Sequence, residues 1–149
     1  MPVMVLSTTI NTTPEHVCQV IEAPSRLLEW VPNVTRVAEI QQTPQRMGDT
    51  FRATYSVLGL SFPTKYTVVD FARNKKITFK MEGALTGTFA WDVEPQGSSA
   101  KVEVRIDYVM KGGILGKAMN AMLVERMNEK NAERMLENLK MLCEAEAKH

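Results

Sequence analysis

Apolar and polar residues alternate with a period of two through the middle of the chain. From residue 100 to residue 110, every second side chain is apolar or aromatic, and most of those between are charged. This alternation is typical of antiparallel strands with one buried face and one solvent-exposed face. Residues 51–57, 77–82 and 87–94 repeat it. Runs rich in β-branched residues at 3–10, 34–41 and 62–71 bring the prediction to about six to seven strands.

The last third of the chain follows a helical period instead. After Gly112 and Gly113 the sequence contains no Pro and is dominated by Ala, Met, Leu, Glu and Lys, which are strong helix formers. A helix of roughly 30 residues would be about 45 Å long. It needs a large surface to pack against, which the predicted sheet supplies. One broad apolar arc contains Ile114, Ala118, Ala121, Val124, Ala132, Met135, Leu136, Leu139, Leu142 and Cys143.

Two short helices are predicted between the first two strands. Thr13 is placed to cap a helix that has Pro14 at its first position and runs to about Ala23. A second helix covers residues 25–30 and is ended by Pro32. The order is strand, two helices, about six strands and a long helix. It predicts an α+β domain in which a curved antiparallel sheet wraps round the C-terminal helix.

Composition places this fold in a broad class. A chain of 149 residues that is 44% hydrophobic predicts one domain with its own core, over residues 1–149. Eighteen basic and 17 acidic residues nearly cancel, with neither sign in a long block, so nucleic acid is not expected as a partner. Two Cys, no recognisable signal peptide and no apolar run of membrane-spanning length predict a cytoplasmic protein.

Several segments are similar to a known superfamily. They are residues 11–17 (NTTPEHV), residues 27–32 (LLEWVP), the last strand leading through Gly112-Gly113 into the long helix, and residues 139–144 (LKMLCE). In this order they resemble the START-like superfamily, also called SRPBCC, which has the helix-grip fold. The branch they resemble most is the polyketide cyclase/dehydrase and lipid-transport group, with relatives of the carbon-monoxide-dehydrogenase type.

The resemblance covers essentially the whole chain and implies one START-like ligand-binding domain. It implies a deep, largely apolar cavity between the curved sheet and the long helix. It does not imply one activity, because members of the superfamily bind lipids, hormones, polyketides and proteins.

The residues give little support to catalysis or metal binding. His16 lies near a helix start and His149 is the last residue, so both are expected at the solvent-exposed surface. His, Cys, Asp and Glu do not occur with metal-ligand spacing, so no metal or cofactor is expected. Cys18 and Cys143 fall on predicted helices and are expected to be buried structural thiols. No catalytic residue is assigned.

Two polar residues lie inside the apolar arc of the long helix. Glu125 and Asn128 are roughly 40° and 20° from the arc centre at Leu139. A buried polar group without a partner costs about 1–3 kcal/mol. We therefore expect both to meet partners in a cavity, where they would fix the polar head of a mostly apolar ligand. Two alternatives stay open: both residues lie at the solvent edge, or Glu125 pairs with a strand Arg.

Aromatic residues on the inward phase of the strands either line this cavity or simply fill the core. The hydroxyl groups of Tyr55 and Tyr108 would give the cavity polar points. Trp30 either lies at the mouth of the cavity or holds the short helix down, and the phase of Tyr66 is undecided. The remaining inward aromatic candidates are Phe79, Phe89 and Trp91.

Methionines add a further feature to the long helix, because its first half is apolar almost all round. Met suits adaptable binding surfaces, and Met122 and Met135 are taken as ligand contacts. Four covers for this end are open: the short helix near Trp30, a second subunit in a homodimer, the ligand itself, or a transient membrane contact during ligand loading. The residues outside the main arc are Leu115, Met119, Met122, Leu123 and Met127.

Three functions remain open from the sequence. The first, favoured by the lack of an obvious acid–base pair, is binding or transport of a small hydrophobic ligand such as a lipid, an isoprenoid or a polyketide-like compound. The second is an enzyme of the cyclase or dehydratase type, which could use positioning with one acid or base, such as Glu125 or a cavity Tyr. The third is a protein-interaction module, which predicts a filled core without a cavity.

Overall fold

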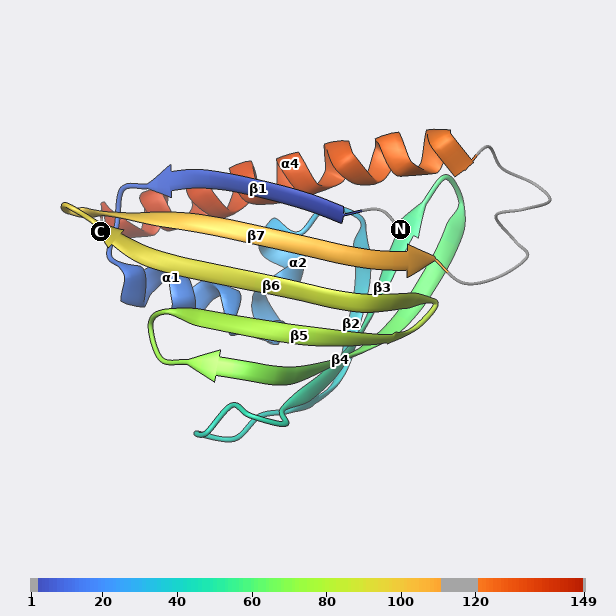
Figure 1. The fold of residues 1–149 in the computed structure, drawn as a ribbon, viewed down its shortest axis with the longest axis horizontal. Helices are drawn as coiled ribbons and strands as arrows, with labels where there is room; N and C mark the ends of the chain where they lie inside the picture. The colour runs from blue at the N-terminus through green and yellow to red at the C-terminus, as the bar shows by residue number, and fades with distance from the viewer. Residues whose placement is uncertain (1–2, 111–120, 149) are drawn as a thin grey trace.

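The computed structural model describes residues 3–110 and 121–148 of the chain. Its order of elements is the predicted one: a strand, short helices, six more strands and a long helix (Figure 1). The elements are β1 (Val3–Ile10), α1 (Pro14–Ile21), the 3-10 helix η1 (Pro24–Arg26), α2 (Leu27–Trp30), β2 (Val34–Gln41), β3 (Thr50–Val57), β4 (Leu60–Ala72), β5 (Lys76–Gly83), β6 (Leu85–Gln96), β7 (Ser99–Met110) and α4 (Ala121–Ala147).

All neighbouring strands pair antiparallel in one sheet of order β1-β7-β6-β5-β4-β3-β2. Strands β2 to β7 therefore follow one another as hairpins, and β1 closes the order beside β7. Figure 1 shows the sheet curving, with β5, β6 and β7 running along α4 and with β2 and β3 crossing them steeply at one end. This is the α+β helix-grip architecture that the sequence predicts.

Local signals in the sequence place the short helices. Thr13 caps α1, its Oγ1 accepting a 3.2 Å hydrogen bond from the backbone N–H of His16, and Pro14 takes the first helical position. The helix ends at Ile21, two residues before the predicted end. The second predicted helix is divided in the structure, with η1 leading into α2.

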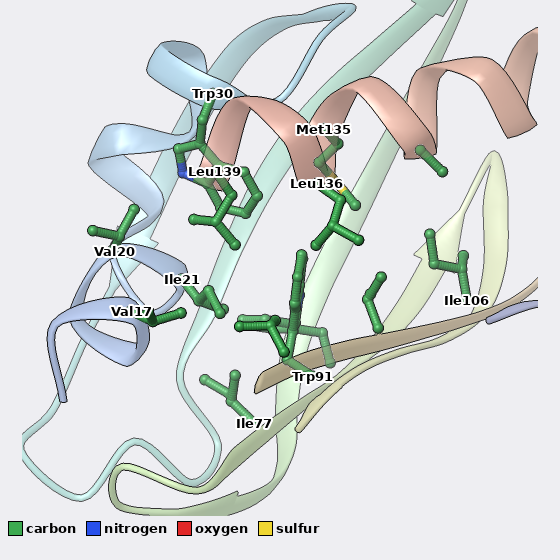
Figure 2. Packing of buried hydrophobic residues seen from close by; sticks show 14 of the residues in the cluster. Val17, Val20, Ile21, Trp30, Ile77, Trp91, Ile106, Met135, Leu136 and Leu139 are labelled. Carbon is green, nitrogen blue, oxygen red and sulfur yellow. The ribbon is translucent and has the colours of Figure 1, made fainter. Parts of the chain in front are cut away.

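The core lies between the helices and the inner face of the sheet. Figure 2 shows Trp30 of α2 and Leu139 of α4 on one side of it and Trp91 of β6 on the other. The rings of Trp30 and Trp91 meet edge to face, with their centroids 5.7 Å apart. Cys18 and Cys143 are both buried, as predicted, and burial raises the pKa of each thiol to about 12.

The long helix is described only from Ala121 onward. The predicted helical positions of Ile114, Leu115, Ala118 and Met119 lie outside the described residues, as does His149. Within the described part, Val124, Ala132, Met135, Leu136, Leu139 and Cys143 of the predicted arc are buried.

Candidate functional site

A cavity with a volume of about 100 Å³ lies between α4 and the inner face of the sheet. Most of its wall is apolar and comes from both ends of the fold, including β1, the segment after α2, and α4. The polar part of the wall comprises Tyr55, Tyr66, Tyr108, Asn128 and Asn131. The apolar part comprises Met4, Val31, Pro32, Val34, Met81, Leu85, Phe89, Ile106, Ala132 and Met135.

Four of the polar residues are joined by hydrogen bonds, and we call them the Tyr/Asn cluster: Tyr55, Tyr108, Asn128 and Asn131. The Tyr55 hydroxyl donates to Asn128 Oδ1 at 2.6 Å and accepts from Asn131 Nδ2 at 2.7 Å. The Nδ2 atom of Asn128 donates to the Tyr108 hydroxyl at 3.0 Å and contacts Met110 Sδ at 3.5 Å. The cluster therefore ties α4 to β3 and β7 across the cavity.

The sequence builds this cluster from two periodicities. Tyr55 and Tyr108 occupy inward positions of β3 and β7, where every second side chain faces the core. Asn128 and Asn131 are three residues apart on α4 and so lie on one side of the helix, one turn from each other. Both asparagines are buried, at 6% and 9% exposure. Buried amides are retained where they are hydrogen bonded, as both are here.

The cluster is uncharged at neutral pH. Burial raises the pKa of the Tyr55 and Tyr108 hydroxyls, and burial also raises that of Tyr66, so all three stay protonated. Asn side chains do not titrate. Among the described residues that line the cavity there is no Lys, Arg, His, Asp or Glu. The site can therefore donate and accept hydrogen bonds but offers no charge to a ligand.

A second, smaller cavity of about 60 Å³ adjoins the first. The two have five side chains in common, and these form the partition between them: Val31, Val34, Tyr66, Phe89 and Met135. The partition is made of side chains and not of backbone elements. Rotation of a flexible residue such as Met135 would therefore connect the two spaces.

Most of the predicted cavity residues do line one of these spaces. The larger cavity is lined by Tyr55, Phe89, Tyr108, Asn128 and Met135. The smaller is lined by Trp30, Phe79 and Trp91, together with Phe89 and Met135.

Glu125 is exposed to solvent, so its predicted orientation into the cavity is wrong. It has nearly the same angular position on the helix as Ala132 and Cys143, both of which are buried. Glu125, however, lies two turns before Ala132. A helical wheel gives the direction of a side chain but not what lies opposite it at that height. The same reasoning applies to Met122, which is 62% exposed and lines neither cavity.

Asn131 and Tyr66 are two site residues that sequence reasoning missed. Asn131 lies near the edge of the apolar arc, and its only signal is the three-residue spacing from Asn128. The phase of Tyr66 is undecided from the sequence because β4 contains an irregularity between Val68 and Asp70, where its pairing with β5 shifts. Tyr66 faces inward and stacks on Phe51, with ring centroids 4.8 Å apart.

Trp30 and His16 are also settled by the structure. Trp30 is 2% exposed and packs on Trp91, so it holds α2 against the core and does not form an open mouth. His16 is half-buried, which makes its predicted solvent-exposed position wrong. Its Nε2 lies 2.8 Å from Glu146 Oε1, and Glu146 also pairs with Arg26. The C-terminal end of α4 covers this part of α1.

The described residues contain no group of three or more His, Cys, Asp or Glu side chains that could hold a metal ion. No described helix combines the length and the apolar character that crossing a membrane requires.

Solved structures with this arrangement are similar in fold and distant in sequence. TTHA0849 from Thermus thermophilus has a TM-score of 0.79 at 19% identity, covering 97% of this chain and 98% of its own. A START superfamily protein from Mycobacterium smegmatis has a TM-score of 0.78 at 14% identity, covering 96% and 97%. The Zhui aromatase/cyclase from a Streptomyces species has a TM-score of 0.76 at 16% identity, covering 96% and 93%.

No curated protein matches the sequence. The family model for polyketide cyclase / dehydrase and lipid transport, by contrast, matches residues 1–144, nearly the whole chain. The fold is START-like, and a sheet and helix of this kind enclose the apolar space described above. The chain belongs to the polyketide cyclase / dehydrase and lipid transport family.

Proposed function

We propose that residues 1–149 act as one ligand-binding domain that binds or carries a small hydrophobic molecule between α4 and the sheet. The observation that carries this proposal is the enclosed cavity, with an apolar wall and a single hydrogen-bonded Tyr/Asn cluster. Apolar pockets with a few placed polar groups are the usual form of small-molecule sites. The family description, which includes lipid transport, supports the same class of ligand.

The cavity is small for such a ligand. Pockets for drug-sized molecules have volumes of about 300–1,000 Å³, against about 100 Å³ and 60 Å³ here. Binding therefore requires the partition residues to move apart and join the two spaces. Met135 and Phe89, which line both cavities, are the side chains we expect to move.

The first experiment is native mass spectrometry of the freshly purified protein, followed by organic extraction and identification of what is released. A co-purified hydrophobic compound in near-stoichiometric amount supports the proposal. A protein that carries no such compound and is not stabilised by any member of a panel of lipids, quinones and aromatic compounds contradicts it.

A matched pair of substitutions on α4 locates the bound molecule. Ala132 lines the cavity, and Ala132→Leu places additional methyl groups in that space. Ala145 is exposed on the same helix, so Ala145→Leu is the control. We expect Ala132→Leu to abolish co-purification and Ala145→Leu to preserve it. Equal occupancy in both variants would place the ligand elsewhere.

A cyclase or dehydratase activity on a polyketide-like substrate is the second candidate. Two of the structurally similar proteins are described as aromatase/cyclases, and the Tyr55 and Tyr108 hydroxyls face the cavity. With pKa values raised by burial, these hydroxyls can donate a proton or a hydrogen bond but are poor general bases. Conversion of the extracted compound on incubation with excess protein would favour this candidate over a carrier.

The third interpretation from the sequence, a protein-interaction module, predicted a filled core. Two adjoining cavities under the sheet speak against it.

A further inference from the structure

The Tyr/Asn cluster has hydrogen-bonding capacity that its own members do not use. Each Asn amide carries two N–H groups and each Tyr one O–H. Three hydrogen bonds join the four residues, and one more contact reaches Met110 Sδ. The cluster therefore holds more hydrogens than these contacts consume. The excess does not depend on which way an amide is turned, because turning it exchanges a donor for an acceptor without changing the number of hydrogens.

The electrostatic surroundings of the cluster disfavour an anion. None of the described lining residues carries a positive charge. The nearby charges that act on Tyr108 are negative: Glu125 and Glu129, both exposed on α4, add to the effect of burial in raising the pKa of its hydroxyl. A buried carboxylate or phosphate without a cationic partner costs far more than a buried neutral group that is hydrogen bonded.

The rest of the wall gives the bound molecule an orientation. The cluster occupies the side of the cavity formed by α4, β3 and β7. The partition residues Tyr66 and Phe89 are aromatic, and the space beyond them is lined by further apolar side chains. A ligand placed with its polar atom at the cluster would extend its apolar body past Phe89 toward the second cavity.

From these three observations we propose that the site selects a ligand whose polar group is uncharged, a carbonyl or a hydroxyl on an apolar aromatic or isoprenoid body, in preference to the corresponding carboxylate. The inference rests on the proposed function, because it assumes that the cavity binds a small molecule. It names the chemistry by which that molecule is recognised.

Three probes with one apolar body test it at neutral pH: naphthalene, naphthol and naphthoate. We expect naphthol to bind the wild-type protein about three- to tenfold more tightly than naphthalene, the gain of a net hydrogen bond. Naphthoate should bind at least about tenfold more weakly than naphthol. Naphthoate binding as tightly as naphthol would overturn the inference. Failure of all three probes to bind the folded protein would overturn the proposed function itself.

Variants assign the preference to the cluster. Asn128→Leu should bring the affinity for naphthol down to that for naphthalene, while naphthalene itself still binds. Tyr108→Phe removes only a hydroxyl and serves as a second variant with minimal risk to folding. Glu125→Leu, on the exposed side of the same helix, should leave the preference unchanged. A preference for naphthol that survives in both cluster variants would remove the Tyr/Asn cluster from recognition and overturn the inference.

Discussion

The hydroxyl of Tyr55 on β3 donates a 2.6 Å hydrogen bond to Oδ1 of Asn128 on α4, although 73 positions separate the two residues in the chain. Asn128 then reaches Tyr108 on β7 through its Nδ2 atom. One side chain of the long helix is thus tied to two strands that stand well apart in the sheet order. This link defines the polar side of the cavity and contributes to holding α4 in place.

Replacement of Asn128 by Leu should destabilise the protein without unfolding it. The change leaves the hydroxyls of Tyr55 and Tyr108 facing an apolar side chain, and we expect a loss of about 1–3 kcal/mol in the free energy of unfolding. Urea denaturation measures this loss. Glu125→Leu, one turn earlier but exposed, should change the stability by no more than about 0.5 kcal/mol. A larger effect at Glu125 than at Asn128 would contradict the orientation of α4 described above.

The two tyrosines of the cluster should differ in their contribution to stability. Tyr55 makes two hydrogen bonds within the cluster and Tyr108 makes one. Phe has the same shape without the hydroxyl, so Tyr55→Phe should cost about 2 kcal/mol and Tyr108→Phe about 1 kcal/mol. Because Tyr55 and Asn131 share a hydrogen bond, the double variant Tyr55→Phe/Asn131→Ala should cost less than the two single changes together. A reversed order of the two Phe variants would show that the hydrogen bonds do not set the cost.

A third prediction concerns the close pairing of β6 and β7 at Gly87. A Cβ atom at this position would lie 1.9 Å from the backbone oxygen of Asp107, and the φ angle of Gly87 is +144°. Because both obstacles are backbone features, Gly87→Ala should cost about 4 kcal/mol or more, which is extreme for one substitution. Gly97, in the turn between the same strands, has a φ of +63° and open space around it. Gly97→Ala should therefore cost only about 1–2 kcal/mol, and similar thermal unfolding of the two variants would contradict the tight approach at Gly87.

The carboxylate of Glu146 should give the protein an acid-sensitive component of stability. Its pKa is lowered below the ordinary value of 4.5, chiefly by hydrogen bonding to Arg26 and then to His16. A carboxylate whose pKa falls on folding stabilises the protein fully above its unfolded-state pKa. That stabilisation disappears as the pH falls through the folded-state pKa. The stability difference between wild type and Glu146→Gln should therefore be present at pH 7 and vanish in strong acid.

Denaturant titrations from pH 7 to pH 2 measure this difference. Glu137→Gln, an exposed position on the same helix, is the control and should follow the wild-type curve throughout. A Glu146→Gln variant that differs from the wild type equally at all pH values would mean that packing, and not the ionised pair, accounts for its effect.

The order of elements and the inward face of most strands could be read from the sequence, because each depends on a local period. Where that period is interrupted, prediction stopped. The pairing irregularity between Val68 and Asp70 shifts the phase of β4 and left Tyr66 undecided. At Glu125 the angular position on the helix is shared with buried residues, but burial also depends on what stands opposite, which no helical period contains.

The candidate site shows the same division. The sequence by itself determined that Tyr55, Tyr108 and Asn128 face the interior, since strand alternation and helical spacing act within a single element. Only the tertiary structure decided that they meet, that Asn131 completes the cluster, and that the enclosed space is divided in two by Phe89 and Met135. The reason is physical: a cavity and its hydrogen bonds arise from the distance at which α4 packs against a curved sheet. That distance is set by the sum of all side chains between them and not by any one segment.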